Sequence, residues 1–215
     1  LLILCILVLG SFVFAEGQGE GSGKAKKHAI MGSSSLGGSW YPTASRIAGV
    51  TMKYTDSVVT VQSSGGGTEN IRLMKQGQYQ MGMAESNIMV YGFQGTHDFA
   101  GDPYPELTFV TQLYPLIFQA VVLKSHGWTT LSDLKGRSFS PGSPGSGDES
   151  AWAEVFEAGF GMSKDDLIWK PLSHNERSMA FKDRVLDCVG YETACPAGSI
   201  LEATAQNPGT ILAIG

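Results

Sequence analysis

The chain alternates short apolar runs, turns rich in glycine and hydroxyl side chains, and segments whose apolar residues recur at helical spacing. Residues 28–31 and 58–61 are apolar runs that predict short buried strands, and residues 137–140 form a third strand candidate. Each is followed by a glycine–hydroxyl turn and then by a predicted helix. Three strand–turn–helix units in one chain predict an α/β fold with open sheets.

Two further apolar runs, residues 107–113 and 117–123, are separated by Tyr114 and Pro115 and are expected to be strands. A proline between two extended runs suits a crossover between two lobes. We therefore expect a first lobe at residues 28–115, a second lobe at residues 116–215, and a ligand cleft between them. The other predicted elements are strands at 79–84, 167–169, 185–189 and 211–214 and helices at 176–181 and 196–205.

The first 15 residues are almost wholly apolar and end in Val13-Phe14-Ala15, a pattern typical of a signal-peptidase site. We expect residues 1–15 to be a removed signal peptide, clipped at its N-terminus, and an uncleaved anchor is the alternative. Residues 16–27, rich in glycine and charge, predict a flexible lead-in. Such a leader directs the protein to the periplasm or another extracytoplasmic compartment.

Composition narrows the functional classes. The chain has 42% hydrophobic residues and a formal net charge of −5, with no basic patch, so nucleic-acid binding is not expected. Two cysteines follow the leader, Cys188 and Cys195, and they either form a disulfide or remain as two buried free thiols, which is the preferred interpretation.

The glycine-rich turns do not match nucleotide-binding motifs. Residues 142–147 lack the Lys-Ser/Thr pair that follows a phosphate loop, and Asp148 and Glu149 would repel phosphate; these two acids are expected to favour a helix N-terminus instead. No nucleophile elbow occurs. We predict no catalytic residue, metal or cofactor, and we expect surface or capping roles for the four histidines, His28, His97, His126 and His174.

The turns instead predict an anion site. In the second unit Thr68 is expected to cap the helix that follows residues 63–67. Bare N–H groups and the positive end of the helix dipole then point beyond the carboxyl end of the strand. Glu85 follows the next predicted strand and has two interpretations: it caps a helix, or it receives the ammonium group of a ligand.

Three motifs resemble the TAXI family, the extracytoplasmic solute receptors of TRAP-type secondary transporters. Their order and approximate spacing agree with that family over nearly all of the chain after the leader. Trp40 and Asp148 depart from the family pattern, in which a tyrosine and a threonine are expected. The motifs are Gly37-Gly38-Ser39-Trp40-Tyr41-Pro42, Ser63-Ser64-Gly65-Gly66-Gly67-Thr68-Glu69-Asn70 and Gly142-Ser143-Pro144-Gly145-Ser146-Gly147-Asp148-Glu149.

The resemblance implies a two-lobed, type II periplasmic-binding-protein fold without catalysis, a small carboxylate or amino-acid ligand such as glutamate or 2-oxoglutarate, and a TRAP-type membrane permease as partner. Family members continue beyond the equivalent of Gly215, so we expect a fragment or a member without its closing segment. An exported transferase-like enzyme or a ligand-sensing lobe is the alternative. The expected ligand-binding residues are Gly38, Ser39, Tyr41, Ser63, Ser64, Gly65, Gly66, Glu85, Ser86, Tyr114, Gly145, Ser146 and Gly147.

Overall fold

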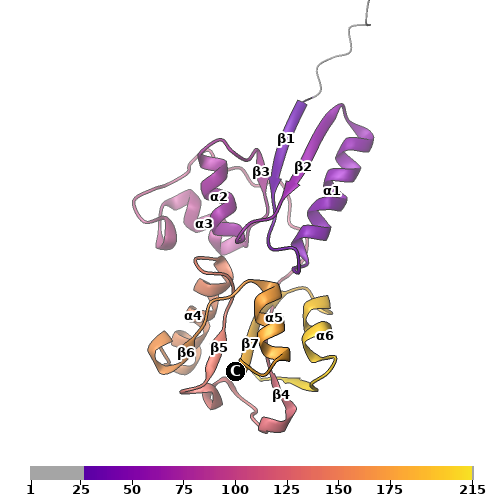
Figure 1. Cartoon of the computed structure of the whole chain (residues 1–215). Helices are drawn as coiled ribbons and strands as arrows, with labels where there is room; N and C mark the ends of the chain where they lie inside the picture. The colour runs from indigo at the N-terminus through magenta and orange to yellow at the C-terminus, as the bar shows by residue number, and fades with distance from the viewer. Residues whose placement is uncertain (1–26, 215) are drawn as a thin grey trace, which may run out of the picture.

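The computed structural model describes residues 27–214, which form two β-sheets, each with its own helices, placed end to end (Figure 1). The predicted signal peptide at residues 1–15 and all but the last residue of the predicted lead-in lie outside the described residues. None of the helices within residues 27–214 combines the length and the apolar character needed to cross a membrane.

The first sheet is parallel and has the strand order β2-β1-β3. Its strands run parallel because helices connect them, and α1 lies on one side of the sheet while α2 and α3 lie on the other (Figure 1). The polar turns that follow β1 and β2 consequently lie together at the carboxyl ends of the strands, which is the end of the sheet nearest the second lobe. The elements are β1 (Lys27–Gly32), α1 (Trp40–Tyr54), β2 (Ser57–Gln62), α2 (Gly67–Lys75), β3 (Met81–Gly82) and α3 (Ser86–Gln94), followed by a short 3-10 helix at His97–Phe99.

The second sheet is mixed, with the strand order β6-β5-β7-β4-β8, and β4 runs antiparallel to both β7 and β8. Its elements are β4 (Ile117–Leu123), β5 (Ser138–Ser140), α4 (Gly147–Phe160), β6 (Ile168–Trp169), α5 (His174–Lys182), β7 (Cys188–Thr193), α6 (Gly198–Thr204) and β8 (Gly209–Ile211), with 3-10 helices at Lys124–His126, Leu131–Leu134 and Lys164–Asp166.

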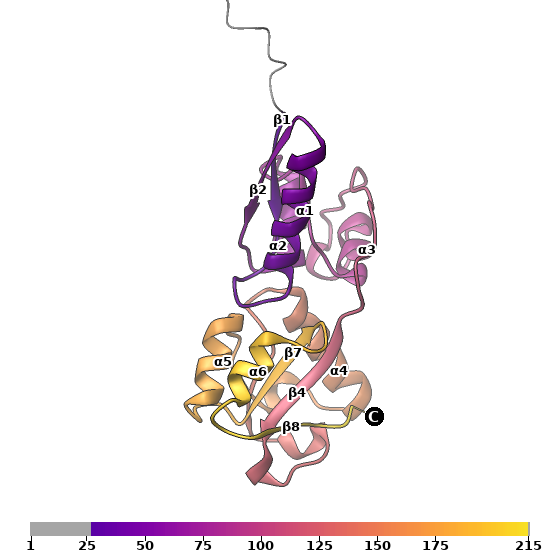
Figure 2. The same cartoon turned by 90° about the vertical axis from the view of Figure 1, so that its right-hand side faces the viewer.

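Alternate side chains of β4 and β7 supply the two cores of the second lobe. Figure 2 shows α5 and α6 on one side of this sheet and α4 on the other. Val121 and Val189 pack in the core with α5 and α6, whereas Val122 and Cys188 pack in the core with α4, as the period of a strand requires. On the α4 side Trp152 is fully buried and packs edge-on against Phe118 and Phe139, with ring centroids 5.1 and 5.2 Å apart. Gly190 permits this packing, because a Cβ there would lie 2.6 Å from the Trp152 ring.

Most predicted elements are confirmed, but residues 107–113 are not a strand. This run pairs with no strand of the described chain, and Phe109 and Val110 are 59% and 87% exposed. An apolar run becomes a strand only when a neighbour satisfies its N–H and C=O groups.

Three smaller corrections concern the bounds of two strands and the exposure of one cysteine. The strand predicted at residues 185–189 lies at Cys188–Thr193, because Tyr191 and Thr193 are buried and extend it. The strand predicted at residues 79–84 is only two residues long, Met81–Gly82. Both cysteines are free thiols, as preferred, but Cys195 is exposed rather than buried.

The aromatic core predicts that removing the Trp152 side chain destabilises the protein. Replacing Trp152 with Ala should lower the free energy of unfolding by about 3–5 kcal/mol, because it leaves a large cavity between α4 and β7. Urea unfolding followed by circular dichroism measures the change. Leu201→Ala on the outer face of α6 is the control, since Leu201 is 64% exposed and should cost less than about 0.5 kcal/mol. Equal losses in both variants would show that this core does not hold the lobe.

Candidate ligand-binding site

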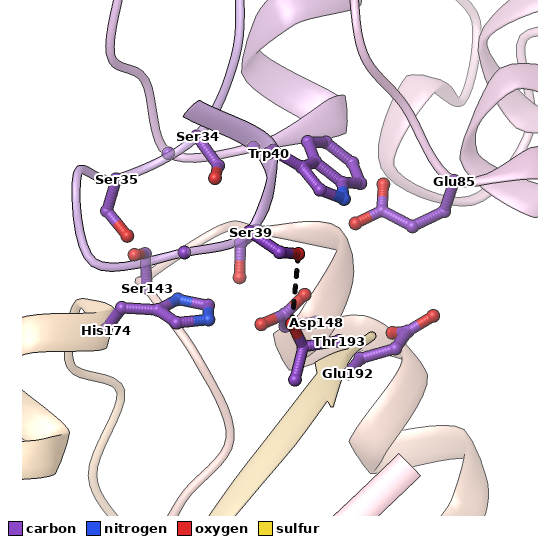
Figure 3. A pocket seen from close by; sticks show the side chains of 14 residues that line it. Ser34, Ser35, Ser39, Trp40, Glu85, Ser143, Asp148, His174, Glu192 and Thr193 are labelled. Carbon is purple, nitrogen blue, oxygen red and sulfur yellow. Dashed lines mark hydrogen bonds between the residues drawn. The ribbon is translucent and has the colours of Figure 1, made fainter. Parts of the chain in front are cut away.

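A pocket lies where the two lobes meet, at the ends of the strands and the starts of the helices (Figure 3). The first lobe contributes the turn after β1, the turn after β2 and the residue before α3. The second lobe contributes the turn before α4, the start of α5 and the end of β7. The cavity has a volume of about 20 Å³ and is lined by Ser34, Ser35, Gly38, Ser39, Trp40, Gly65, Gly66, Glu85, Ser143, Ser146, Asp148, His174, Glu192 and Thr193.

A buried asparagine fixes the first turn in place. The side-chain amide of Asn70 donates hydrogen bonds to the carbonyls of Ser33 and Met83, at 2.7 and 2.8 Å, and so joins the ends of β1 and β3. Ser64 donates to the same Ser33 carbonyl at 2.9 Å. Gly32 leaves room for this arrangement, because a Cβ there would lie 2.3 Å from the Asn70 side-chain oxygen. The turns of β1 and β2 are therefore held as one unit.

Two of the glycine turns each contain the same kind of internal hydrogen bond. The N–H of Gly65 donates to Glu69 at 2.6 Å, and the N–H of Gly145 donates to Glu149 at 2.8 Å. In each case the carboxylate comes four residues after the glycine and closes the turn in front of the helix. The amides of Gly65 and Gly145 are thus satisfied within their own turns. The first N–H groups of α2 and α4 remain as the backbone donors at these turns.

The cap of α2 differs from the prediction. Thr68 lies inside the helix, where it is fully buried, and the N-cap residue is Gly66. Gly66 has φ of +121°, a conformation that side chains with a Cβ rarely adopt. The turn therefore depends on this glycine, and the helix begins without a side-chain cap. The corresponding cap of α4 is a conventional one, because the N–H of Glu149 donates to the hydroxyl of Ser146.

Three acidic side chains line the pocket, and a single buried arginine faces one of them. Arg177 is fully buried and pairs with Asp148 through Nη2 at 3.1 Å, while its Nη1 donates to the carbonyl of Pro141 at 2.8 Å. Its guanidinium also stacks over the ring of Tyr191, 4.7 Å from the centroid. Arg177 therefore compensates Asp148. Glu85 and Glu192 have no ion pair within the described part of the chain.

Glu85 lies in the contact between the lobes. It occupies the N-cap position of α3, yet its side chain makes no capping hydrogen bond, so the helix-cap interpretation is wrong. The side chain is only 7% exposed, and its Oε2 has no partner among the described residues. A Cβ added to Gly67 or Gly147, the first residues of α2 and α4, would come within 2.2 and 2.8 Å of that oxygen. Each lobe thus supplies a glycine where the carboxyl fits.

Burial shifts the ionisation of the acidic side chains. Burial, and then the neighbouring Asp148, raise the pKa of Glu85 to about 8. Burial again, followed by Asp148, Glu85 and Glu154, raises the pKa of Glu192 to about 9. Burial raises the pKa of Asp148 too, although Arg177 opposes the shift. Near neutral pH the two glutamic acids consequently hold protons.

His174 is the functional candidate that the histidine pattern missed. It lies in the pocket at the start of α5, and its ring contacts Arg177 Nη2, whereas a surface or capping position was expected. Burial, and secondarily the charge of Arg177, place the pKa of His174 well below its ordinary value, so the ring is neutral.

The predicted site residues divide into two groups. Six line the pocket, namely Gly38, Ser39, Gly65, Gly66, Glu85 and Ser146. Tyr41, Ser63, Ser64, Ser86, Tyr114, Gly145 and Gly147 are not among its lining residues, although the Tyr114 hydroxyl lies 3.1 Å from the Ser39 hydroxyl. Eight lining residues were not assigned to the site, namely Ser34, Ser35, Trp40, Ser143, Asp148, His174, Glu192 and Thr193.

Direct hydrogen bonds cross between the lobes. The hydroxyls of Ser39 and Thr193 lie 3.1 Å apart at the edge of the pocket (Figure 3). On the outer side Ser150, on α4, donates to Asp98 at 2.9 Å.

Within residues 27–214 no three His, Cys, Asp or Glu side chains are placed to hold a metal ion. The arrangement suits binding of a small solute between two surfaces that both carry polar turns.

Comparison with known proteins identifies relatives of the chain. The sequence profile of the NMT1-like family matches residues 31–215. The alkanesulfonate-binding protein SsuA from Xanthomonas axonopodis pv. citri superposes with a TM-score of 0.59 at 19% identity, over 88% of this chain and 61% of SsuA. The arginine-, lysine-, histidine-binding protein ArtJ from Geobacillus stearothermophilus superposes with a TM-score of 0.60 at 11% identity, over 87% of this chain and 76% of ArtJ.

A structure described for glutathione import via GshT and the cystine ABC importer TcyBC of Streptococcus mutans is also similar, with a TM-score of 0.62 at 12% identity, over 87% of this chain and 76% of that one. The chain spans about three fifths of the length of SsuA. These likenesses confirm the predicted α/β, periplasmic-binding-protein-like fold.

The ionisation of Glu85 predicts a pH-dependent effect of Glu85→Gln on stability. In the folded state the pKa of Glu85 is about 8, so its carboxyl keeps a proton that the unfolded chain releases from about pH 4.5 upward. The free energy of unfolding therefore falls between these pH values. Glutamine removes that loss, so the variant should be more stable than the parent by about 2–4 kcal/mol above about pH 8, and nearly equal to it below about pH 4.5.

Urea unfolding at the two pH extremes tests this expectation. Glu106→Gln is the matched control, because Glu106 is exposed and its replacement should change stability by less than about 0.5 kcal/mol at either pH. A Glu85→Gln effect that is the same at low and high pH would mean that the Glu85 carboxyl is hydrated in solution.

Proposed function

The chain belongs to the NMT1-like family, and from this premise we propose that it is the extracytoplasmic solute-binding receptor of a membrane uptake system. Structural neighbours with this fold are named for binding sulfonates and basic amino acids, which supports a solute-binding role. The apolar leader at residues 1–15 supports export to the periplasm or an equivalent compartment.

The observation that carries the proposal is the pocket between the lobes, lined by hydroxyl-rich turns from both of them. Ser34, Ser35 and Ser39 come from the first lobe, and Ser143 and Ser146 come from the second. A solute that contacts both sets binds better when the lobes are close together, so binding and closure are thermodynamically linked. Hinge closure of this kind would present a different surface to the permease when the solute is bound.

A small acid is the solute class that the donors favour. Serine hydroxyls and the first N–H groups of α1 and α4 are hydrogen-bond donors to carboxylate or sulfonate oxygens. The three motifs that resemble the TAXI family support a TRAP-type permease as the partner, with glutamate or 2-oxoglutarate as candidate solutes. The same fold in a protein described with an ABC importer makes an ABC-type permease the alternative partner.

The pocket supports a receptor over an enzyme. His174 is the histidine among its lining residues, and both ring nitrogens face Arg177 Nη2, at 2.8 and 3.0 Å. Within the described chain no serine or threonine hydroxyl hydrogen-bonds to that ring, so no nucleophile–base pair is assembled there.

The receptor function predicts that bulk in the pocket abolishes binding. Purified protein should retain a small acid or amino acid that native mass spectrometry detects, and isothermal titration with that solute should show one site. Ser143→Trp should weaken binding about 100-fold or more, because the indole fills a cavity bordered by both lobes.

Ser132→Trp is the matched control, since Ser132 is exposed in the 3-10 helix Leu131–Leu134 and should leave the affinity unchanged. Thermal melting of both variants shows whether they are folded. Undiminished binding by a folded Ser143→Trp protein would place the solute elsewhere.

A further inference from the structure

Glu85 and Glu192 approach the same pocket from different lobes. Glu85 precedes α3 in the first lobe, and Glu192 lies near the end of β7 in the second; Figure 3 shows Glu85 beside Trp40 and Glu192 beside Thr193. Each has a buried Oε2 with no hydrogen-bond partner among the described residues. Two unpartnered carboxyl oxygens in one pocket call for a donor that the described chain does not supply.

The charges around the pocket do not balance within the described chain. Arg177 is paired with Asp148, and the lysines that form ion pairs are Lys75, Lys135 and Lys164, whose partners are other carboxylates. His174 is the remaining basic group at the pocket, and burial keeps the pKa of its ring low, so it adds no charge. An ionised carboxylate buried without a counter-charge is strongly unfavourable, so a proton or a cation has to accompany Glu85 and Glu192.

We propose that Glu85 and Glu192 form a subsite for a protonated amine, and that the solute is accordingly an amino acid or a similar zwitterion. This assignment rests on the receptor function proposed above and narrows its solute class. Simple carboxylates and sulfonates lack the ammonium group that this subsite would bind.

The shape and donors of the pocket agree with such a ligand. A cavity of about 20 Å³ accepts a group the size of a water molecule, and an ammonium group has that size. An ammonium group has three N–H donors, and the lining offers it one carboxyl from each lobe and the hydroxyls of Ser39 and Thr193. Ser34, Ser35 and Ser143 belong to the same lining and are hydroxyl donors suited to an acidic group.

Closure and amine binding are coupled in this arrangement. An ammonium between Glu85 and Glu192 links the first lobe to the second, because each carboxyl belongs to a different lobe. Without it, both carboxyls keep their protons near neutral pH, because their ionised forms would be destabilised by burial and by the neighbouring acidic groups. Arg177 faces Asp148 and the ring of Tyr191, so its charge is already engaged. The amine therefore adds an attraction between the lobes to the hydrogen bonds of Ser39 with Thr193 and of Ser150 with Asp98.

Amine binding also releases protons. Since the pKa values of Glu85 and Glu192 are about 8 and 9, both acids are protonated near neutral pH and lose protons when the ammonium arrives. Affinity for an amine should consequently rise with pH up to that range, whereas affinity for a keto acid should not. Asp148, Glu154, His174 and Arg177 are the other titratable or charged groups that face these acids, and His174 stays neutral throughout.

The test uses the full chain and pairs of probes that differ by the amine. The pairs are L-glutamate with 2-oxoglutarate, L-alanine with pyruvate, and 2-aminoethanesulfonate with ethanesulfonate. Isothermal titration should show that the amine member of a binding pair is preferred by roughly tenfold or more. Repeating the titration in buffers of different ionisation enthalpy should show proton release for the amine member alone.

Variants separate a ligand contact from a structural role. Glu85→Gln and Glu192→Gln should each weaken the amine probe by roughly tenfold or more, and should leave its amine-free partner unchanged or bound more tightly. Glu157→Gln, on the exposed side of α4, is the matched control and should alter neither affinity. Thermal melting of each variant establishes that it is folded.

Equal affinity for the two members of a pair, or equal losses for both in the glutamine variants, would overturn the amine subsite and leave the receptor function standing. Failure of every probe, with no solute found in the purified protein, would overturn the receptor function and the subsite with it.

Discussion

Two carboxyl groups without a counter-charge lie where the lobes meet: Glu85 is buried, and Glu192 is half-buried. Glu85 fits between Gly67 and Gly147, the first residues of a helix in each lobe, and neither glycine has room for a Cβ. Glu192 enters the same pocket from the second sheet. Because an ionised carboxylate cannot be buried alone at low cost, contact between the lobes depends on the protonation of these groups or on a cation beside them.

The rest of the pocket holds these two groups in place. Asn70 joins the ends of β1 and β3, and Arg177 neutralises Asp148 while it packs on Tyr191. These hydrogen bonds and the ion pair fix the side chains of Asn70 and Arg177 in place, and leave the two glutamic acids as the groups without a counter-charge. The hydroxyl-rich turns complete a site that holds both hydroxyl donors and acids. A solute of mixed charge complements such a site better than a simple anion does.

Local pattern predicted the strand–turn–helix units, because a strand, its glycine turn and the next helix are adjacent in the chain. β1, β2 and α4 lie close to their expected positions, and six of the expected site residues line the pocket. Glu192 and Thr193 escaped prediction, since they come to the pocket through the pairing of β7 with β4, which no local pattern contains. The strand prediction for residues 107–113 failed for the same reason. The apolar content of a segment can be read from its own sequence, whereas the presence of a partner strand cannot.

The central claim is that the carboxyls of Glu85 and Glu192 lie in the pocket without a compensating charge, and carbon-13 NMR of labelled glutamate side chains tests it most directly. A pH titration of the full chain, with each glutamine variant to assign the signals, should show these two carboxyls titrating with pKa values of about 8 and about 9. Titration of both near the ordinary value of 4.5 would contradict the account, because it would show that water or a cation of the chain already compensates them.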